Sequence, residues 1–438
     1  MKKILVTLLL LALAGTCFAQ GQAPPAVPPV PAATSPAPDS NDTAMRLKAL
    51  EEKIVALEAE VKTLKEAQAL PAAPSTTASS SSSAETAMAA NAYPPPAPAQ
   101  VQGPTQGGVI GGAPQNAKLL NPDISMIGNF IATAGGNPFR PGPALEFHEA
   151  ELGVQAVIDP YSRADFFLSF GEEGVELEEG YITFTGLPKS FVARAGKMRS
   201  SFGVVNTKHN DALPWIDRPL ATENLVAGED GINDAGFSIN RIFPGPKGIV
   251  LEATGQVFRG DSGDVFTSHQ RSDLSYVGRL RGYKDLTEST NLDVGFSYAR
   301  GHNDVGTNFF TQLFGTDVTL RWKPLRRAIY HNLLWRSEFF WSERQQLPTA
   351  QRAFGFYSAA DYRLNRRWTV GGRFDRSDRA RNDNLTDSGF SAVLTYWPSE
   401  FSQVRTQYRW GRFAEGKNTN ELKVQLLFSL GAHGAHPF

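Results

Sequence analysis

Long segments of alternating polar and apolar residues fill the chain from about residue 119 to its end. In FSQVRTQYRW, from Phe401 to Trp410, Val404 and Tyr408 lie on one face, whereas Arg405 and Arg409 lie on the other. A side-chain period of two indicates a β-strand with two chemically different faces. Beyond the N-terminal leader, no apolar run reaches the length of about eighteen residues that a spanning helix needs. If this chain enters a membrane, it therefore does so with strands.

The N-terminus has the residue order of a secretory signal. Two lysines precede the apolar run Ile4 to Ala14, and small residues follow it. We expect residues 1–19 to be removed, so that the mature chain begins at Gln20. The single cysteine, Cys17, leaves with this signal, which excludes disulfides, thiol catalysis and cysteine-based zinc sites from the mature chain.

Two linkers and a heptad repeat separate the signal from the strand-rich part. Residues 20–41 and 69–118 are rich in Pro, Ala, Ser and Gly, and they have too few large apolar side chains to offset the entropy cost of ordering. We expect both to be disordered. Residues 42–68 carry Leu, Ile and Val at a positions and Leu at d positions, which predicts a short coiled coil, dimeric or trimeric. A helix packed on a domain is the alternative, but the linkers leave no domain beside it.

Residues 119–438 contain sixteen segments with strand patterning, separated by Gly, Pro, Asn and Asp. The sixteen segments are residues 124–134, 144–159, 162–171, 175–186, 190–199, 234–243, 248–259, 272–284, 289–301, 313–324, 331–344, 352–364, 366–378, 387–397, 401–413 and 419–430. Most are longer than the five or six residues that are typical of soluble strands. An even count of long antiparallel strands is typical of outer-membrane barrels.

Aromatic and arginine side chains distinguish a membrane barrel from a soluble sandwich. Aromatic residues gather near segment ends, as they do in an interfacial girdle: Trp322, Trp341, Trp368, Trp397, Phe401 and Trp410. An arginine on a lipid-facing strand costs about 2–4 kcal/mol at the midplane, so the polar faces must line a lumen. The sequence therefore predicts an all-β fold, a sixteen-stranded antiparallel transmembrane β-barrel, preceded by a short periplasmic coiled-coil helix and disordered linkers.

Connection lengths suggest which end of the barrel faces outward. Connections after even-numbered segments are short, such as LPKS and PSE, whereas most of those after odd-numbered segments are longer, such as HNDVGTNFFTQ and RARNDNLTD. Short turns face the periplasm in such barrels, and long loops face outside. We therefore expect a protein of the outer membrane of a Gram-negative bacterium, with its coiled coil in the periplasm and lipid around the barrel.

Several of these features occur together in one known family. The secretory signal, the coiled coil, sixteen long strands, the segment RAGKMRSSFG before a long irregular stretch, and the final strand ending LLFSLG resemble the phosphate-selective porin O and P family of Gram-negative outer-membrane channels. The resemblance covers about residues 124 to 438. It implies a homotrimer with a water-filled pore in each subunit, and a long loop after the fifth strand that folds inward to narrow the pore.

The irregular stretch after the fifth segment, about residues 200–233, is the candidate constriction loop. Family members that select phosphate use lumen arginines and lysines, but from Ser200 to Asp234 this chain has two bases against six acids. We expect the constriction to be formed by Lys208, His209, Asp211, Asp217, Arg218, Glu223, Glu229 and Asp230.

The predicted inward faces of the barrel divide by charge. The early strands carry mainly acids, among them Glu149, Glu151, Asp165, Glu179 and Glu252. The later strands are basic, and we expect a pore-lining wall of Arg279, Arg281, Arg321, Arg336, Arg373, Arg405 and Arg409. An acidic loop facing a basic wall creates a transverse field that passes small polar solutes without a strong preference for either ion sign.

The sequence therefore predicts a passive diffusion porin for small hydrophilic solutes or inorganic ions. An anion- or phosphate-selective porin is one alternative, and a structural anchor carrying a periplasmic coiled-coil spacer is another. No histidine spacing matches a metal or catalytic motif, so we expect no enzyme, cofactor or metal site. The formal net charge of -1 gives no footprint for nucleic acid.

Overall fold

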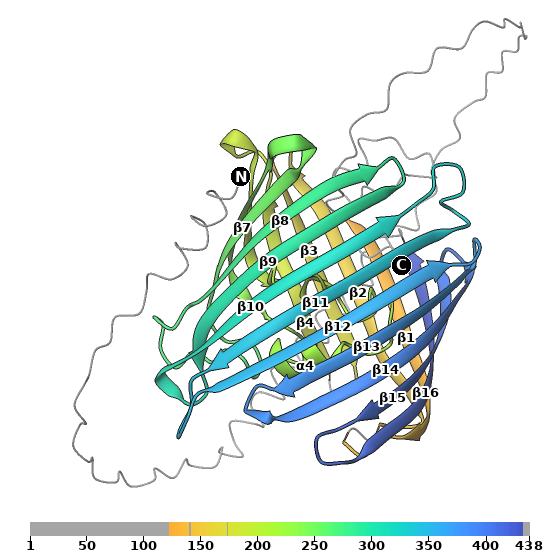
Figure 1. The fold of residues 1–438 in the computed structure, drawn as a ribbon. Coiled ribbons are helices and arrows are strands. Elements are labelled where there is room, and N and C mark those ends of the chain that lie inside the picture. Colours follow the sequence, from red (N-terminus) through yellow and green to blue (C-terminus); the bar gives the residue numbers. More distant parts are fainter. Residues whose placement is uncertain (1–121, 140–141, 173, 432–438) are drawn as a thin grey trace, which may run out of the picture. The chain divides into compact units, whose positions relative to one another are not determined.

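The computed structural model describes residues 122–139, 142–172 and 174–431, in which the chain forms a closed antiparallel β-barrel (Figure 1). Each strand pairs with its neighbours in sequence, and β1 pairs with β16 to close the ring. The strands are β1 (Asp123–Gly136), β2 (Leu145–Asp159), β3 (Ser162–Gly171), β4 (Gly174–Phe184), β5 (Phe191–Arg199), β6 (Asn233–Pro244), β7 (Val250–Phe258), β8 (Ser275–Thr287), β9 (Thr290–Asn303), β10 (Gly306–Trp322), β11 (Asn332–Arg344), β12 (Gln351–Arg363), β13 (Trp368–Arg379), β14 (Asn382–Ser399), β15 (Ser402–Arg412) and β16 (Asn418–Gly431). The predicted sixteen-stranded barrel is confirmed. The signal, the linkers and the coiled coil lie outside the described residues.

Alternation places polar side chains inside the barrel and apolar ones outside. On β15, Arg405 and Arg409 are buried, whereas Tyr408 and Trp410 between and beside them are exposed. The outward positions of other strands are likewise apolar and exposed, for example Phe237 on β6 and Leu280 on β8. A closed ring also pairs the backbone of every strand on both sides, which a membrane requires.

Two long connections that we expected are mostly strand. β10 begins at Gly306 instead of residue 313, and β14 begins at Asn382 instead of residue 387. Only Asp304 and Val305 separate β9 from β10. The added residues, GTNFFTQ in β10 and NDNLT in β14, do not alternate between polar and apolar, so a search for such alternation does not recognise them as strands.

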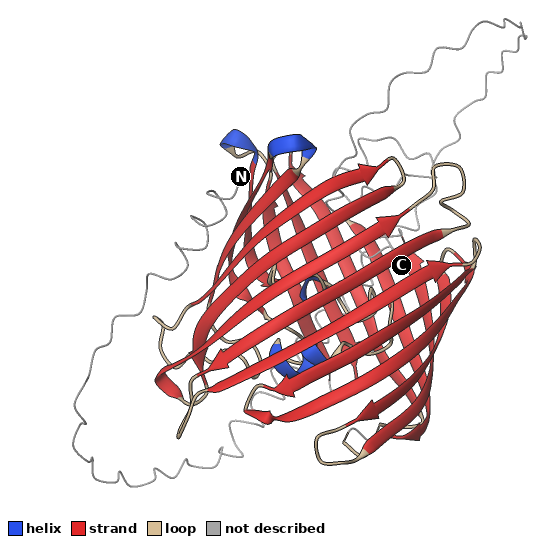
Figure 2. Ribbon diagram, viewed as in Figure 1, coloured by secondary structure: helices blue, strands red, loops and turns tan. Residues whose placement is uncertain are grey.

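The segment between β5 and β6 lies inside the barrel. It contains η2 (Val205–Thr207) and α4 (Leu220–Leu225), and Figure 2 shows α4 within the ring of strands. The turns after β4 and β6 contain the short helices η1 (Pro188–Ser190) and η3 (Pro246–Gly248). No helix of the described residues is long and apolar enough to cross a membrane.

Two apolar clusters fasten this inner loop, residues 200–232, to the wall. In the first, Phe202 and Leu225 pack with Phe340 of β11 and Ala353 of β12. In the second, the loop supplies Val205, Leu213 and Trp215, and the wall supplies Tyr357, Ala359 and Val393. Inward positions that are apolar or small therefore leave room for the loop and hold it by burial of apolar surface.

Candidate functional site

The start of the inner loop is held by polar side chains of three strands. The backbone N–H of Ser201 donates to Gln256 Oε1 at 2.7 Å, and that of Gly203 donates to Ser297 Oγ at 3.1 Å. The N–H groups of Val204 and Val205 donate to the two carboxylate oxygens of Glu338, at 2.7 and 3.0 Å. Because Glu338 is fully buried, these charge-assisted hydrogen bonds lie away from water and fix the backbone firmly.

The middle of the loop contacts the acidic side of the barrel through His209. Its Nδ1 lies 2.9 Å from Glu151 Oε2 and 2.9 Å from Glu178 Oε2, and its Nε2 lies 2.8 Å from Glu179 Oε2. Burial lowers the pKa of His209, but the three carboxylates outweigh it and raise the pKa well above its usual value. Glu151, Glu178 and His209 also place three metal-ligating atoms within 4.8 Å of one another.

Asp211 lies two residues further on, in the same acidic region. It is 1% exposed, and neither of its carboxylate oxygens has a hydrogen-bond partner. Burial raises its pKa well above the usual value, and the nearby charge of Glu151 raises it further.

The far part of the loop contacts the basic side of the barrel through Asp217. Its carboxylate accepts hydrogen bonds from Arg373 at 3.1 Å, from Arg409 and from Gln407. Burial alone would raise the pKa of Asp217, but Arg373 and Arg409 outweigh this effect and hold the pKa below its usual range. Arg373 also donates to Asp375 at 2.9 Å, so this ion-pair network joins the loop to two strands.

Aromatic and arginine side chains complete the contact with the basic wall. The ring of Trp215 lies 4.8 Å from the guanidinium of Arg373 and 5.8 Å from that of Arg336, distances at which cation–π attraction operates. Arg405 donates to the carbonyl of Trp215 at 3.3 Å. Within the loop, Arg218 donates to Asn210 Oδ1 at 2.7 Å, and burial lowers its pKa to about 9.

The remaining predicted loop residues have differing surroundings. Glu223 is buried on α4, whereas Glu229 and Asp230 are exposed at the end of the loop. Lys208 is half-buried, and its burial, with the charges of Arg336 and Arg321, lowers its pKa to about 8. The acids that give the loop its net charge therefore do not gather on one surface.

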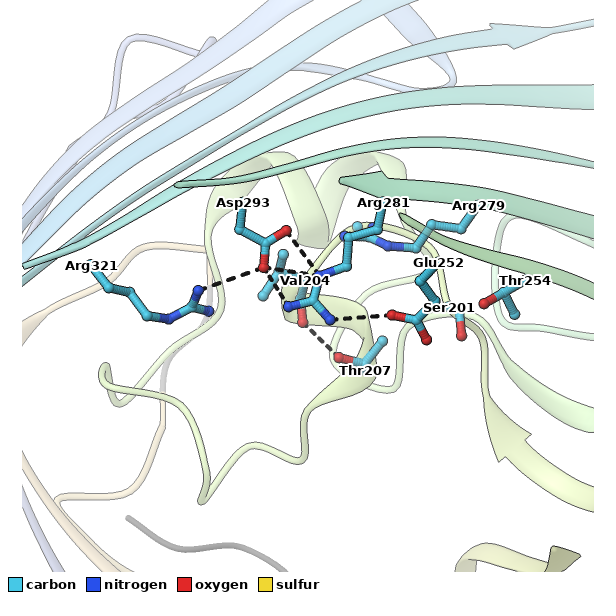
Figure 3. A pocket seen from close by; sticks show the side chains of 10 residues that line it. Ser201, Val204, Thr207, Glu252, Thr254, Arg279, Arg281, Asp293 and Arg321 are labelled. Carbon is cyan, nitrogen blue, oxygen red and sulfur yellow. Dashed lines mark hydrogen bonds and ion pairs between the residues drawn. The ribbon is translucent and has the colours of Figure 1, made fainter. Parts of the chain in front are cut away.

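An unfilled pocket of about 200 Å³ lies between the loop start and the wall formed by β7 to β10 (Figure 3). Its lining residues are Ser201, Gly203, Val204, Thr207, Glu252, Thr254, Arg279, Arg281, Asp293 and Arg321. The loop contributes only neutral groups to this pocket, and the wall contributes three arginines and two acids.

Ion pairs position the charges of this pocket. Arg281 donates to both oxygens of Asp293 and lies 3.3 Å from Glu252 Oε2. Arg321 lies 3.5 Å from the same Asp293 carboxylate, as Figure 3 shows. Arg279 pairs instead with Asp317, at 2.9 Å. Glu252 and Asp293 thus compensate the charges of Arg281 and Arg321 beside the pocket.

The structure divides the predicted basic wall into two groups. Arg279, Arg281 and Arg321 border the pocket. Arg336, Arg373, Arg405 and Arg409 are buried where the loop covers the wall. Our sequence analysis did not include Glu252, Asp293 or the neutral loop start among the site residues. Small and apolar residues on both faces of AFGFYSAA, in β12, were the signal that something packs against this strand from inside.

Comparison with known proteins bears on the fold. No family model matches the chain. A protein of Aquifex aeolicus (strain VF5), described only as uncharacterized, is 27% identical over 331 residues, which cover 66% of this chain and 69% of that protein. Among solved structures, an anion-selective porin from Comamonas acidovorans matches with a TM-score of 0.50 and 10% identity, over 71% of this chain and 100% of that one. The barrel has a porin fold.

A second solved structure, the high-pH form of Pseudomonas putida OprB, matches with a TM-score of 0.49 and 8% identity, over 72% of this chain and 95% of that one. The likeness to the Comamonas porin establishes the fold alone. Membership of the phosphate-selective family stays a prediction. Within this porin fold, the described lumen holds an inner loop with a charged pocket beside it.

Proposed function

We propose that this protein is an outer-membrane porin through which small hydrophilic solutes or inorganic ions diffuse passively. The observation that carries the proposal is the pocket beside the loop start, which stays unfilled although the loop packs tightly elsewhere in the lumen. Water and small solutes would pass between Thr207 on the loop and Arg321 on the wall. The narrow opening would limit the size of the solutes.

We further propose that the passage has only a weak preference for ion sign. Asp217, one of the acids in the loop, is engaged by Arg373 and Arg409 and does not face the pocket. The charges at the passage are instead Arg281 and Arg321 against Glu252 and Asp293. Opposite charges across a narrow low-dielectric opening create a transverse field, which admits dipolar solutes and both kinds of ion.

Anion selectivity is a second candidate, and a specific observation favours it. Glu252 and Asp293 balance Arg281 and Arg321, but Lys208, which lies close enough for Arg321 to lower its pKa, adds one more positive charge. An excess of positive charge at the opening would favour anions. The similar Comamonas structure carries the description of an anion-selective porin.

Reversal potentials in planar bilayers test both candidates. The purified protein is inserted between KCl solutions that differ tenfold in concentration, and detergent alone serves as the control. A potential near zero supports the weakly selective porin, and a potential close to the chloride equilibrium value supports the anion-selective one. A barrel that inserts without conducting contradicts both and favours the structural anchor.

We propose a homotrimer in the outer membrane of a Gram-negative bacterium, with lipid against the apolar outer face. The family resemblance and the predicted coiled coil support this assembly. We also propose that the protein is no enzyme. Chemical cross-linking of the purified protein measures the number of subunits.

A further inference from the structure

Five carboxylates gather where the inner loop contacts the acidic wall. Glu151 of β2 and Glu178 and Glu179 of β4 contact His209. The charges of Glu149 and of Asp211 on the loop lie within range of the same group. Arg199 balances one of them, since its guanidinium lies 2.9 Å from Glu178 Oε2. Even with a protonated His209, acids outnumber bases in this cluster, which we call the His209 cluster.

Asp211 is the residue that indicates a ligand. Its side chain is buried, and both of its carboxylate oxygens lack a hydrogen-bond partner. A buried carboxylate without a partner is strongly unfavourable, and proteins normally satisfy it by an ion pair, hydrogen bonds or a metal. Its surroundings are already negative because of Glu151, Glu149 and Glu178. A cation that joins the cluster would balance this charge.

The two contacts of His209 Nδ1 come close to the geometry that a metal needs. Nδ1 lies 2.9 Å from one oxygen of Glu151 and 2.9 Å from one oxygen of Glu178. Tetrahedral zinc, with bonds of about 2.0–2.2 Å to nitrogen and oxygen, holds its ligands about 3.3 Å apart. A metal could therefore replace the proton on Nδ1 after shifts of a few tenths of an ångström. Nε2 would continue to donate to Glu179, the carboxylate–histidine arrangement that supports many metal-bound histidines.

We propose that the His209 cluster binds one divalent transition-metal ion of the zinc class, with Glu151, Glu178 and His209 as ligands and the buried carboxylate of Asp211 as a nearby negative charge that favours the ion. The imidazole nitrogen favours zinc over calcium, which prefers six to eight oxygen ligands. The ligands come from β2, β4 and the loop, so the ion fixes the loop to the acidic wall. The spacing of these residues along the chain matches no metal motif, which explains why the sequence analysis expected no metal site.

Zinc titration of the full mature protein in detergent tests the site. His433→Ala and His436→Ala form the parent background, because these tail histidines could bind metal themselves. After removal of metal with a chelator, isothermal calorimetry should show one zinc per chain. Asp211→Asn and Glu151→Gln should each weaken zinc binding by about 10- to 100-fold. Glu176→Gln is the matched control and should bind like the parent, since Glu176 is exposed and pairs with Lys197 outside the cluster.

Two outcomes overturn the proposal: a parent that binds no zinc, and a Glu151→Gln variant that binds zinc as the parent does. A second measurement, the unfolding temperature, keeps the proposal testable if a substituted protein folds poorly. Without metal, Asp211→Asn should unfold at a higher temperature than the parent, because a neutral amide costs less to bury beside Glu151 and Glu149 than a group that can ionise. At the same zinc concentration, zinc should raise the unfolding temperature of the parent by more than that of Asp211→Asn. An unfolding temperature of the parent that zinc leaves unchanged also overturns the proposal.

Discussion

Asp217 holds the inner loop against the basic wall. Its carboxylate faces Arg373 and Arg409, whose side chains are almost fully buried. Asp217→Asn would leave two buried guanidiniums with less compensation, and breaking a buried pair costs about 3–5 kcal/mol. We expect the loop of this variant to detach from the wall, with a higher and noisier single-channel conductance. Glu229→Gln is the control, because Glu229 belongs to the same loop but is exposed. Equal conductance of both variants would contradict this role for Asp217.

The pKa of the Asp217 carboxylate predicts how the inner loop responds to a fall in pH. Arg373 and Arg409 hold the pKa of Asp217 below its usual value, against the effect of burial. A lowered folded-state pKa stabilises the fold fully above the unfolded pKa of about 3.9, and this stabilisation is lost as pH falls through the folded pKa. We expect steady conductance as pH falls from 7 to 4, and loop release only below that. Asp217→Asn should lack this acid transition. If the conductance of the wild-type protein changed near pH 6, a group other than Asp217 would be responsible for the change.

Substitutions of Arg321 and of Glu252 test whether solutes pass through the pocket, because they change its charge in opposite directions. Both line the pocket, and Asp293 keeps its pair with Arg281 when Arg321 is removed. We expect Arg321→Gln to shift the reversal potential toward cation preference and Glu252→Gln to shift it toward anion preference. Arg326→Gln, in the connection between β10 and β11, is the control for a general charge effect. Identical shifts from Arg321→Gln and Arg326→Gln would show that the pocket is not the passage.

At the scale of elements, the strands were predictable because the two faces of each strand lie in different surroundings. An apolar outer face and a polar lumen impose a period of two, so the segment 401–413 corresponds closely to β15 (Ser402–Arg412). The prediction was wrong at the start of β10 and β14, which begin at Gly306 and Asn382. There, polar and apolar residues do not alternate, so the local pattern does not mark a strand.

The inner loop was predictable in its position but not in its contacts. Its irregular composition between two strand-like segments indicated a long insertion. Which side chain it places against which wall depends on pairs distant in sequence, such as Asp217 with Arg409 and His209 with Glu151. No local pattern encodes these pairs. Alternation placed Glu252 on an inward face, but it could not show that Glu252 and Asp293 lie beside the start of the loop.

Substitutions at two glycines of the inner loop distinguish the effect of backbone strain from the effect of a clash with a specific side chain. Gly203 (φ +66°) and Gly228 (φ +68°) both adopt a left-handed conformation, which costs other residues about 1–2 kcal/mol. A β-carbon at Gly203 would overlap Glu338 Oε2, whereas at Gly228 it would meet nothing within 4 Å. Glu338 cannot easily move away, because it accepts hydrogen bonds from Val204, Val205 and Tyr357.

We therefore expect Gly203→Ala to loosen the loop more than Gly228→Ala does. Trypsin digestion of the folded barrel measures this, because Lys208 is a potential cleavage site within the loop, whereas Pro219 protects the bond after Arg218. Gly203→Ala should be cleaved there at least several-fold faster than Gly228→Ala. Similar rates would mean that backbone strain, and not the contact with Glu338, governs the stability of the loop.

For the whole molecule, the predicted coiled coil at residues 42–68 raises the question of what holds the subunits together. Three heptads form a marginal helix in isolation, so we expect the barrels to associate first and the coil to form because they are already close. Deletion of residues 42–68 should therefore leave single-channel conductance unchanged and the cross-linked trimer intact, while lowering the temperature at which the trimer dissociates. A monomeric deletion variant would assign assembly to the coil. Normal conductance with a weakened cell envelope would instead show that the coil acts as a spacer.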